Sequence, residues 1–593
     1  MKDRAVVYRH MFGLSWRVAP AVTVVNIVLI ALMSGAVALT AAAQRLLIDG
    51  ASSGTTTAIV VAAALGVPAH AGTFLMARIQ GEVRQDQIVR VARELDLEVL
   101  TLAAGIPTLE HLERPDFLDR VTNLRRGTMA LAASVWSAAS FVGALLSLGA
   151  SVWLLTGVHP ALPLLTAFAV PLLLLTNRGN RHRRLVRDRT GESERHERSL
   201  HELCLRPDPA KELRIAGSGP HLSLRASQLW DDTTRQLTRA RAVATGYEAI
   251  GWLVLLAALG TALAFTLSLY TEGRASIGDV VLLTTLATAL SGQIERIVVG
   301  FSTVTDAGHV TDHYLWLKEY SKARSMVGRA APERLVTGIS LRGITFSYPG
   351  TSTRVLDGID LDLLAGSTVA FVGLNGAGKT TMIKLLTGLY RPEAGTITAD
   401  GVPLTDIGPR RWADRCAGVF QDFARLQFLV RENVGVGDLP RLDDTGAIVD
   451  AVSRAGARPV VDNLPEGLDA QLGTLFQGVD LSYGQWQKLA LARGIMRKRP
   501  LLLILDEPTS ALDPQAEHEL FETFTAQARD AAAHGAVTVI VSHRFSTVNM
   551  ADHIVVIDGG RVLEQGSHTD LLDADGLYAK LYTAQAHAYA NQD

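Results

Sequence analysis

The sequence predicts two joined domains, an all-α membrane domain of six helices followed by an α/β domain. Three observations lead to this prediction. Long apolar stretches are confined to about the first 300 of the 593 residues. Two long segments between these stretches are rich in arginine. After about residue 338, short apolar strands alternate with polar motifs, and a glycine-rich loop directly follows one of the strands.

Composition sets the broad limits. A chain of 593 residues is too long for one ordinary domain. The net charge of −2 provides no overall attraction to nucleic acid, and we expect no nucleic-acid partner. The two cysteines, Cys204 and Cys416, lie far apart in the sequence and lack metal-ligand spacing. We therefore expect both to be reduced thiols without a functional role.

Six stretches are apolar enough to form helices that cross a bilayer, which requires about 20 such residues. The fourth is the shortest; the six cover residues 18–43, 57–79, 128–155, 161–176, 248–270 and 277–300. An even number of spans places both ends of the chain on one side. A cleaved signal peptide is the alternative for the first stretch. Its apolar run, however, exceeds a typical h-region, and five further stretches follow.

Basic residues between the spans predict the orientation. Residues 78–127 contain eight Arg, and residues 177–247 contain fourteen Arg and one Lys. The short loops around Asp49, His159 and Arg274 contain almost none. By the positive-inside rule, both long loops, both termini and the α/β domain are predicted to be cytoplasmic. The protein would then be a multi-pass protein of the inner (plasma) membrane, surrounded by membrane lipid.

The two long loops are expected to be helices that extend beyond the membrane. Prolines interrupt both of them: Pro115 in "HLERPDFLDR", and Pro207 and Pro209 in "LRPDPAKELRIAG". New short helices are expected near residues 112–121 and 207–216. They are either parts of solvated hairpins or crosswise helices that touch the α/β domain, and spacing alone does not decide.

Few polar residues lie within the predicted spans, and an ionisable residue there is a functional candidate. Glu295 and Arg296 are near the predicted cytoplasmic end of the last span, so we expect them at the membrane interface. His70 lies deeper, where it could face a substrate cavity or form a helix-to-helix hydrogen bond. Asn26 and Gln293 also stand out as polar residues within the spans.

The stretch "TVAFVGLNGAGKTT" combines a short buried strand, residues 369–372, with the pattern G-x-x-x-x-G-K-[ST]. In such a loop, backbone N–H groups and the next helix N-terminus bind phosphate oxygens. Lys379 is placed for the β- and γ-phosphates of a nucleotide, and the Thr380 hydroxyl for Mg²⁺. A surface glycine-rich turn is the alternative. The predicted nucleotide-binding residues here are Gly373, Leu374, Asn375, Gly376, Ala377, Gly378, Lys379, Thr380 and Thr381.

Two further strands end in chemically useful residues. "LLLILDEP" places Asp506 and Glu507 at the carboxyl end of an apolar strand. Asp506 there can hold Mg²⁺, and Glu507 can orient or polarise an attacking water. "VTVIVSHR" leads in the same way to His543.

These motifs together resemble the ATP-binding cassette (ABC) family over nearly the whole chain. "LSYGQ" at 481–485 is similar to the family's signature motif, and "SALD" at 510–513 to its D-loop. Six spans before one cassette resemble the type IV (type I exporter) half-transporter, in which two chains intertwine. The resemblance implies bound ATP and Mg²⁺, with site roles for Tyr348, Gln421, Ser482, Gly484, Gln485, Asp513 and His543.

The resemblance assigns these roles residue by residue. Tyr348 in "FSYPG" would stack on adenine, and Gln421 would be the Q-loop ligand near the metal together with Thr380 and Asp506. Glu507 and His543 would be catalytic. Ser482, Gly484 and Gln485 would reach the ATP of a partner chain, and Asp513 would lie in the D-loop. Tyr483 replaces the first glycine of the commoner LSGGQ, and its role is open.

The resemblance also implies a domain plan and a function. Residues 1–320 would form the membrane domain with coupling helices near 112–121 and 207–216, residues 321–337 a linker, and residues 338–585 the nucleotide-binding domain. The expected activity is ATP hydrolysis coupled to export of a peptide or small natural product, by a homodimer or a heterodimer that sandwiches two ATP. The alternatives are a lipid or drug flippase, a siderophore importer, and an ATP-gated regulatory protein. The presence of Glu507 argues against the last.

Overall fold

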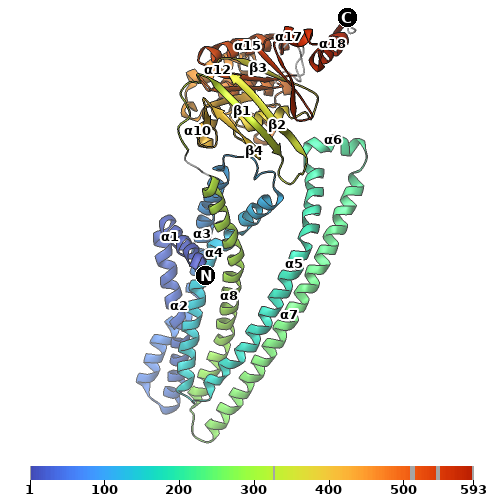
Figure 1. The fold of residues 1–593 in the computed structure, drawn as a ribbon. Helices are drawn as coiled ribbons and strands as arrows, with labels where there is room; N and C mark the ends of the chain where they lie inside the picture. Colours follow the sequence, from blue (N-terminus) through green and yellow to red (C-terminus); the bar gives the residue numbers. More distant parts are fainter. Residues whose placement is uncertain (1, 325–327, 508–513, 543–547, 591–593) are drawn as a thin grey trace. The chain divides into compact units, whose positions relative to one another are not determined.

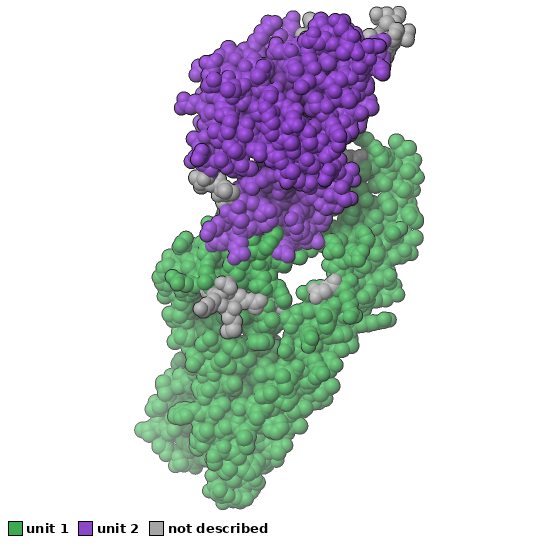
Figure 2. Space-filling model, viewed as in Figure 1, with its two compact units in different colours: residues 1–100, 122–316 green, residues 101–121, 317–593 purple. Residues whose placement is uncertain are grey.

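The computed structural model describes residues 2–324, 328–507, 514–542 and 548–590 (Figure 1). The chain divides into two compact units, coloured in Figure 2. Unit 1 comprises residues 1–100 and 122–316, and unit 2 comprises residues 101–121 and 317–593. The domain plan from the sequence placed residues 101–121 with the membrane helices, whereas their contacts group them with the C-terminal unit.

In its described part, unit 1 is helical, and its six helices long and apolar enough to span a membrane confirm that prediction. A separate helix, α1 (Lys2–Val18), precedes them. A short helix, α6 (Pro207–Ile215), connects two of them. The six are α2 (Pro20–Ser53), α3 (Thr56–Ala104), α4 (Pro115–Thr156), the 3₁₀ helix η1 (Leu162–Phe168) continued by α5 (Ala169–Leu205), α7 (Gly219–Thr271) and α8 (Ile277–Arg324).

The prolines of the two long loops begin helices of very different length. Proline suits the first helical turn, where a missing N–H costs nothing. Pro207 follows the extended residue Arg206 and starts the nine-residue α6. Residues 109–113 form turns, and Pro115 starts α4, which continues to Thr156. The short separate helix expected near 112–121 is therefore wrong, because nothing after Pro115 interrupts the helix.

Glycine allows α5 and α7 to run side by side, as Figure 1 shows. A Cβ on Gly179 would lie 3.0 Å from the Cα of Ala244, and one on Gly251 would lie 2.8 Å from the Cα of Leu172. Small residues at such positions let helix backbones approach closely where no hydrophobic effect drives association.

Buried polar side chains of unit 1 join neighbouring helices. Asn26 of α2 donates to the Gln87 Oε1 of α3 at 3.2 Å, and Gln87 donates to the Thr23 hydroxyl at 2.6 Å. Gln293 of α8 donates to the Ser147 and Ser151 hydroxyls of α4 at 2.9 and 3.0 Å. Both Asn26 and Gln293 thus have the helix-to-helix role that polar residues commonly take in membranes.

Unit 2 is an α/β domain with two sheets. The smaller sheet has the order β2-β1-β4-β5, formed by β1 (Gly338–Ser347), β2 (Arg354–Leu364), β4 (Ala394–Ala399) and β5 (Val402–Pro403). The larger has the order β10-β9-β3-β8-β7-β6, formed by β3 (Thr368–Val372), β6 (Cys416–Val419), β7 (Leu502–Asp506), β8 (Val537–Val541), β9 (His553–Asp558) and β10 (Arg561–Gly566). Neighbouring strands of the larger sheet are parallel, except that β9 and β10 are antiparallel.

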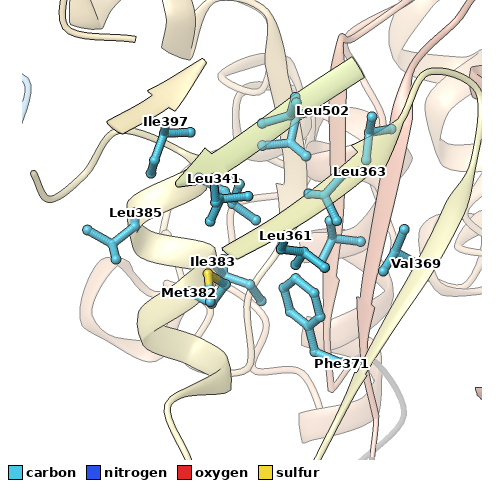
Figure 3. Packing of buried hydrophobic residues seen from close by; sticks show 14 of the residues in the cluster. Leu341, Leu361, Leu363, Val369, Phe371, Met382, Ile383, Leu385, Ile397 and Leu502 are labelled. Carbon is cyan, nitrogen blue, oxygen red and sulfur yellow. The ribbon is translucent and has the colours of Figure 1, made fainter. Parts of the chain in front are cut away.

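The main core of unit 2 joins both sheets to α9 (Lys379–Leu386). Leu341 of β1, Leu361 of β2, Phe371 of β3 and Ile383 of α9 all lie in it, as Figure 3 shows. The other α-helices of this unit are α10 (Pro409–Ala413), α11 (Val430–Gly435), α12 (Thr445–Arg454), α13 (Arg458–Asp462), α14 (Tyr483–Gly494), α15 (Pro514–Ala533), α17 (His568–Asp573) and α18 (Leu577–Ala590). The described residues of this unit also form the 3₁₀ turns η2 (Leu439–Arg441), η3 (Gly467–Asp469) and η4 (Thr474–Phe476).

The strand register brings the predicted motifs to one edge of the larger sheet. β8 lies between β3 and β7, with Val541 paired to Phe371 on one side and to Asp506 on the other. The carboxyl ends of these three parallel strands therefore meet, and this is where ligands bind in open α/β sheets.

Candidate functional site: a phosphate-binding loop beside two strand-end carboxylates

The loop between β3 and α9 has the backbone of a phosphate cradle. Gly373, Gly376 and Gly378 have φ values of 154°, 83° and 107°. These values lie in the region that residues with a Cβ rarely adopt. Contacts add a second constraint, because a Cβ on Gly373 would lie 2.1 Å from the Ile557 carbonyl oxygen. The sequence pattern therefore reflects two separate needs, an unusual backbone and close approach to β9.

The intervening residues differ in exposure. Leu374, Asn375 and Gly376 are exposed, whereas Ala377 is buried. The first three residues therefore lie at the protein surface, while Ala377 anchors the loop in the core of unit 2. The helix α9 begins directly after Gly378.

Lys379 is buried in the loop and donates to the loop's own carbonyl oxygens. Its Nζ lies 2.8 Å from the Gly373 oxygen and 2.9 Å from the Leu374 oxygen. Burial lowers the pKa of this amine, while the carboxylates of Glu507 and Asp506 oppose that shift. The pairing of β3 and β7 with β8 brings the loop of Lys379 to the same sheet edge as both carboxylates, although they are more than 120 residues away in the sequence.

Asp506 is 2% exposed at the end of β7, and its Oδ1 has no hydrogen-bond partner among the described residues. A buried polar atom without a partner is unusual and calls for an explanation. Burial and the adjacent Glu507 carboxylate raise the pKa of Asp506 to about 6, against the opposing effect of Lys379. A cation at this position would satisfy the orphaned oxygen, so the donor chemistry fits Mg²⁺.

Glu507 is held in a strained backbone conformation. Its φ is 45°, uncommon for a residue with a side chain. Its N–H donates to the Val541 carbonyl oxygen of β8 at 2.9 Å. Strain of this kind persists where surrounding structure enforces it, and it is found preferentially at functional sites. The side chain is half-buried rather than enclosed.

The hydroxyl candidates Thr380 and Thr381 lie at the start of α9, and Gln421 follows β6, the strand that pairs with β7. Thr380 and Gln421 are exposed, and Thr381 is buried with its hydroxyl 3.0 Å from the Tyr348 hydroxyl. The Tyr348 ring contacts Phe346 and Tyr390 edge-on, with centroids 5.2 and 5.6 Å apart. Tyr348 is therefore beside the start of α9, and its ring already packs on other aromatic rings.

The signature segment forms the start of α14. Ser482 is the N-cap and accepts a hydrogen bond from the Gln485 N–H at 3.3 Å, while the Gln485 side chain accepts from the Ser482 N–H at 2.8 Å. This reciprocal capping fixes the helix N-terminus, and Ser482 stays exposed. Gly484 follows in the first turn and is half-buried.

Tyr483, which the motif pattern does not explain, packs on the segment that contains Gln421. Its ring lies 5.3 Å from the Phe423 ring, and the Arg425 guanidinium lies 5.4 Å from its centroid. Phe423 and Arg425 were missed from the sequence, because no residue pattern connects positions 60 residues apart. The aromatic ring at 483 thus joins the signature helix to the Q-loop segment.

Two predicted site residues, Asp513 and His543, lie outside the described residues. His543 follows Ser542, which directly extends β8. The described part of the chain contains no cluster of three or more His, Cys, Asp or Glu able to hold a metal. A Mg²⁺ ion bound by few protein groups, the remaining ligands being phosphates and water, does not need such a cluster.

We expect Asp506→Asn to stabilise the nucleotide-free protein. The raised pKa of Asp506 means that the folded state binds this proton more tightly than the unfolded state. Stability from this group is therefore full below about pH 4 and is lost as pH rises through about 6. At pH 8, Asn should raise the free energy of unfolding by about 1–3 kcal/mol.

Thermal unfolding between pH 4.5 and 8, without nucleotide or Mg²⁺, measures this effect. The gain should shrink toward the acidic end, where the wild-type carboxyl is protonated. The control is Asp443→Asn, which changes an exposed aspartate. Asp552 is unsuitable as a control because its carboxylate accepts a hydrogen bond from the Thr368 N–H. A variant less stable than wild type at pH 8 would contradict the expected cost of the buried charge.

Comparisons with known proteins agree with this geometry. Residues 356–510 match the ABC transporter family. An ATP-dependent lipid A-core flippase of Chromobacterium violaceum is 40% identical over 249 residues, which are 42% of this chain and 41% of the flippase. The subtilin transport ATP-binding protein SpaT of Bacillus subtilis is 37% identical over 247 residues, 42% of this chain and 39% of that protein.

The aligned segments thus cover about two fifths of either relative. A solved structure extends the likeness in fold. A bacterial Atm1-family ABC exporter with ATP bound matches 95% of this chain and 98% of its own, with a TM-score of 0.80 at 24% identity. Six apolar helices precede the α/β unit in the present chain as well. The chain therefore has the fold of an ABC exporter half-transporter, with an ABC transporter domain at residues 356–510.

Proposed function

We propose that this protein is an ATP-driven exporter that hydrolyses ATP and works as a dimer. The observation that carries the proposal is the meeting of the phosphate loop, Lys379, Asp506 and Glu507 at one sheet edge, in a chain with six membrane-spanning helices. These are the parts that nucleotide hydrolysis requires: a phosphate cradle, a cation site and a carboxylate beside it.

Each residue has a role that its surroundings support. The loop N–H groups and Lys379 would bind the phosphates, and the exposed Thr380 hydroxyl and Asp506 would hold Mg²⁺. Bound there, Mg²⁺ would neutralise charge on the phosphates. Glu507, half-buried next to Asp506, would position the attacking water and accept its proton. Tyr348 would turn toward the adenine ring, exchanging contacts with Phe346 and Tyr390 for a stacking contact.

A dimer follows from the resemblance of residues 481–485 to a signature motif that serves a partner's ATP. Ser482 is exposed and is held by reciprocal capping, so it is available to a second chain. We propose a homodimer, since Glu507 and the complete phosphate loop leave no defective site that a different partner would have to supply. A heterodimer is the alternative, distinguished by whether the purified chain alone hydrolyses ATP.

The transported substrate is proposed only as a class. Relatives include a lipid A-core flippase and a subtilin transport protein, so both lipid and peptide cargo are open. We favour export of a peptide or small natural product, with a lipid or drug flippase as the alternative. The direct test is ATP-dependent uptake by inside-out vesicles, comparing wild type with Glu507→Gln. Equal uptake by both would contradict ATP-driven transport.

We further propose that both termini and the ABC transporter domain are cytoplasmic, because the arginine-rich segments flank the spans on that side. Ser52, at the end of α2, and Ser199, on α5 beyond the apolar stretch, are both exposed and report opposite sides. In intact cells, a cysteine at 52 should react with an impermeant maleimide and one at 199 should not.

This labelling requires replacement of Cys204, which is exposed on α5. Cys416 is a weaker background, because burial raises the pKa of its thiol to about 12 and keeps the reactive thiolate scarce. Permeabilised cells, in which both introduced cysteines should react, provide the control. Labelling at 199 but not at 52 in intact cells would reverse the proposed orientation.

A further inference from the structure

Unit 1 contains a partly open cavity of about 620 Å³ between α2, α3, α4 and α8. Its lining includes three ionisable side chains, Arg84 of α3 and Glu295 and Arg296 of α8. Two guanidinium groups and one carboxylate leave a net positive charge. The sequence had indicated His70 as the residue to face a cavity and had placed Glu295 and Arg296 at the membrane interface. His70 is not among the lining residues and instead contacts the Phe74 ring, with centroids 5.4 Å apart.

These charged side chains have no polar partner in the part of the chain that the structure describes. The side chains of Arg84, Glu295 and Arg296 form no hydrogen bond, and no ion pair within 4.0 Å, with any other residue that the structure describes. Gln293 on the same helix offers a contrast, because it is buried and bonded to two serines of α4. Ionisable groups close to apolar spans are costly unless paired or solvated. All three side chains are exposed and therefore solvated, so it is their gathering around one cavity, rather than a cost of burial, that points to a charged ligand.

The remaining lining divides into polar and apolar parts. Serine hydroxyls come from α2 and α4, and the Ser140 Oγ is buried without a hydrogen-bond partner among the described residues. Ile30, Phe74 and Val299 provide apolar surface from three different helices. The cavity therefore presents charged and hydroxyl groups together with an apolar surface, as an amphipathic ligand requires.

Tight helix packing fixes the walls. A Cβ on Gly143 of α4 would lie 2.8 Å from both the Ile30 Cγ2 and the Ser34 hydroxyl of α2. A Cβ on Gly300 of α8 would lie 3.0 Å from the Phe141 Cβ of α4. Because α4 is packed this closely against both neighbours, the space beside these contacts is a defined feature of the helix bundle rather than loose packing.

We propose that this cavity binds an amphiphile with a net negative head group. The guanidinium groups of Arg84 and Arg296 bind the anion, since arginine matches carboxylate and phosphate oxygens with paired N–H donors. Glu295 lies next to Arg296 in the lining and reduces the net positive charge of the cavity. The apolar part of the ligand packs on Ile30, Phe74 and Val299. The inference rests on the proposed exporter function, for which it names the substrate class.

Binding without nucleotide tests this directly. The protein is placed in nanodiscs of phosphatidylcholine, a lipid without net charge, and titrated with three probes of equal chain length. They are N-dodecanoylglycine (a carboxylate), dodecyl phosphate and dodecyltrimethylammonium (a cation), each corrected for uptake by empty nanodiscs. At least one anion should bind about tenfold or more tightly than the cation. Equal binding of all three, or a preference for the cation, overturns the proposal.

Substitutions locate the site. Arg84→Gln and Arg296→Gln should each weaken the preferred anion about tenfold, Arg296→Lys should retain most of the binding, and Glu295→Gln should strengthen it by removing repulsion. The control is Arg78→Gln, an exposed residue of α3 that pairs with Glu82 and does not line the cavity. Helical content and elution volume verify that each variant is folded.

The outcomes separate cleanly. Loss of affinity in Arg84→Gln and Arg296→Gln but not in Arg78→Gln supports the proposal; equal loss in all three, or in none, refutes it. Preference for the carboxylate assigns a peptide-like head group, and preference for the phosphate a lipid-like one. Because no ATP is present, the result stands apart from the exporter proposal. A protein that fails to transport can still show the anion preference, and a working transporter can lack it.

Discussion

Glu507→Gln should slow ATP hydrolysis by about 10²- to 10⁴-fold, which is the usual cost of losing a general base. It should leave ATP binding nearly intact. Glutamine keeps the size of the side chain and removes its charge and basicity. Glu507 extends β7 next to Asp506, with its N–H anchored to the Val541 carbonyl oxygen. This anchor and the φ of 45° hold the backbone in place, so the amide should occupy the position of the carboxylate.

Phosphate release by purified protein at saturating MgATP measures this effect, with Glu466→Gln, an exposed glutamate outside the site, as the matched control. Because ATP would bind without being cleaved, the variant should also accumulate a closed dimer. Cysteines at Ser482 of one chain and Asn375 of the other should then cross-link. Hydrolysis at a near wild-type rate would show that another group activates the water.

Lys379→Ala should abolish binding and turnover together, each by about 100-fold or more. The amine is buried and donates to two carbonyl oxygens of the loop, so it lies within the loop that would surround the phosphate oxygens. Hydrogen bonds from a charged donor are worth about 1.5–3 kcal/mol each, and two of them account for a loss of this size. Unlike Glu507, Lys379 would contact the nucleotide before any chemistry occurs.

Equilibrium binding of a fluorescent ATP analogue, together with the ATPase rate, separates the two variants. Lys498→Ala is the control, since it removes a lysine whose side chain is exposed and pairs with Asp450. Weak binding in Lys379→Ala and near-normal binding in Glu507→Gln is the expected contrast. Tight binding by Lys379→Ala would mean that the backbone N–H groups of the loop suffice to hold the phosphates.

The local motifs of unit 2 could be predicted because each depends on residues close in the sequence. The loop from Gly373 to Thr380 follows its own strand, and Asp506 and Glu507 follow theirs. That the two meet depends on β8 pairing with both strands, a long-range register that spacing alone does not contain. Tyr483 shows the same limit, because its partners Phe423 and Arg425 are distant in sequence.

In unit 1, the length of the apolar stretches predicted six spans. The prediction of which ionisable residues line the cavity was wrong. Depth within a span favoured His70, whereas helix packing turns Glu295 and Arg296 toward the cavity. The side of a helix that faces a cavity depends on its neighbours, and single-residue polarity does not encode them. Pro115 shows a further limit, because a proline that can interrupt a helix can equally well begin one.

Residues 101–121 have a practical consequence for any attempt to study the ABC transporter domain in isolation. The Leu109 N–H donates to the Leu389 carbonyl oxygen at 2.9 Å, and His111, 2% exposed, packs its ring on Phe117 and Tyr320. A fragment cut at Gly338 would lack this segment together with Tyr320. It would expose surface that is covered in the full chain, and its solubility and melting temperature would describe a truncated fold. Supplying residues 101–121 as a separate peptide would restore the Leu109 contact but not the packing on Tyr320, so the fragment should also include the end of α8.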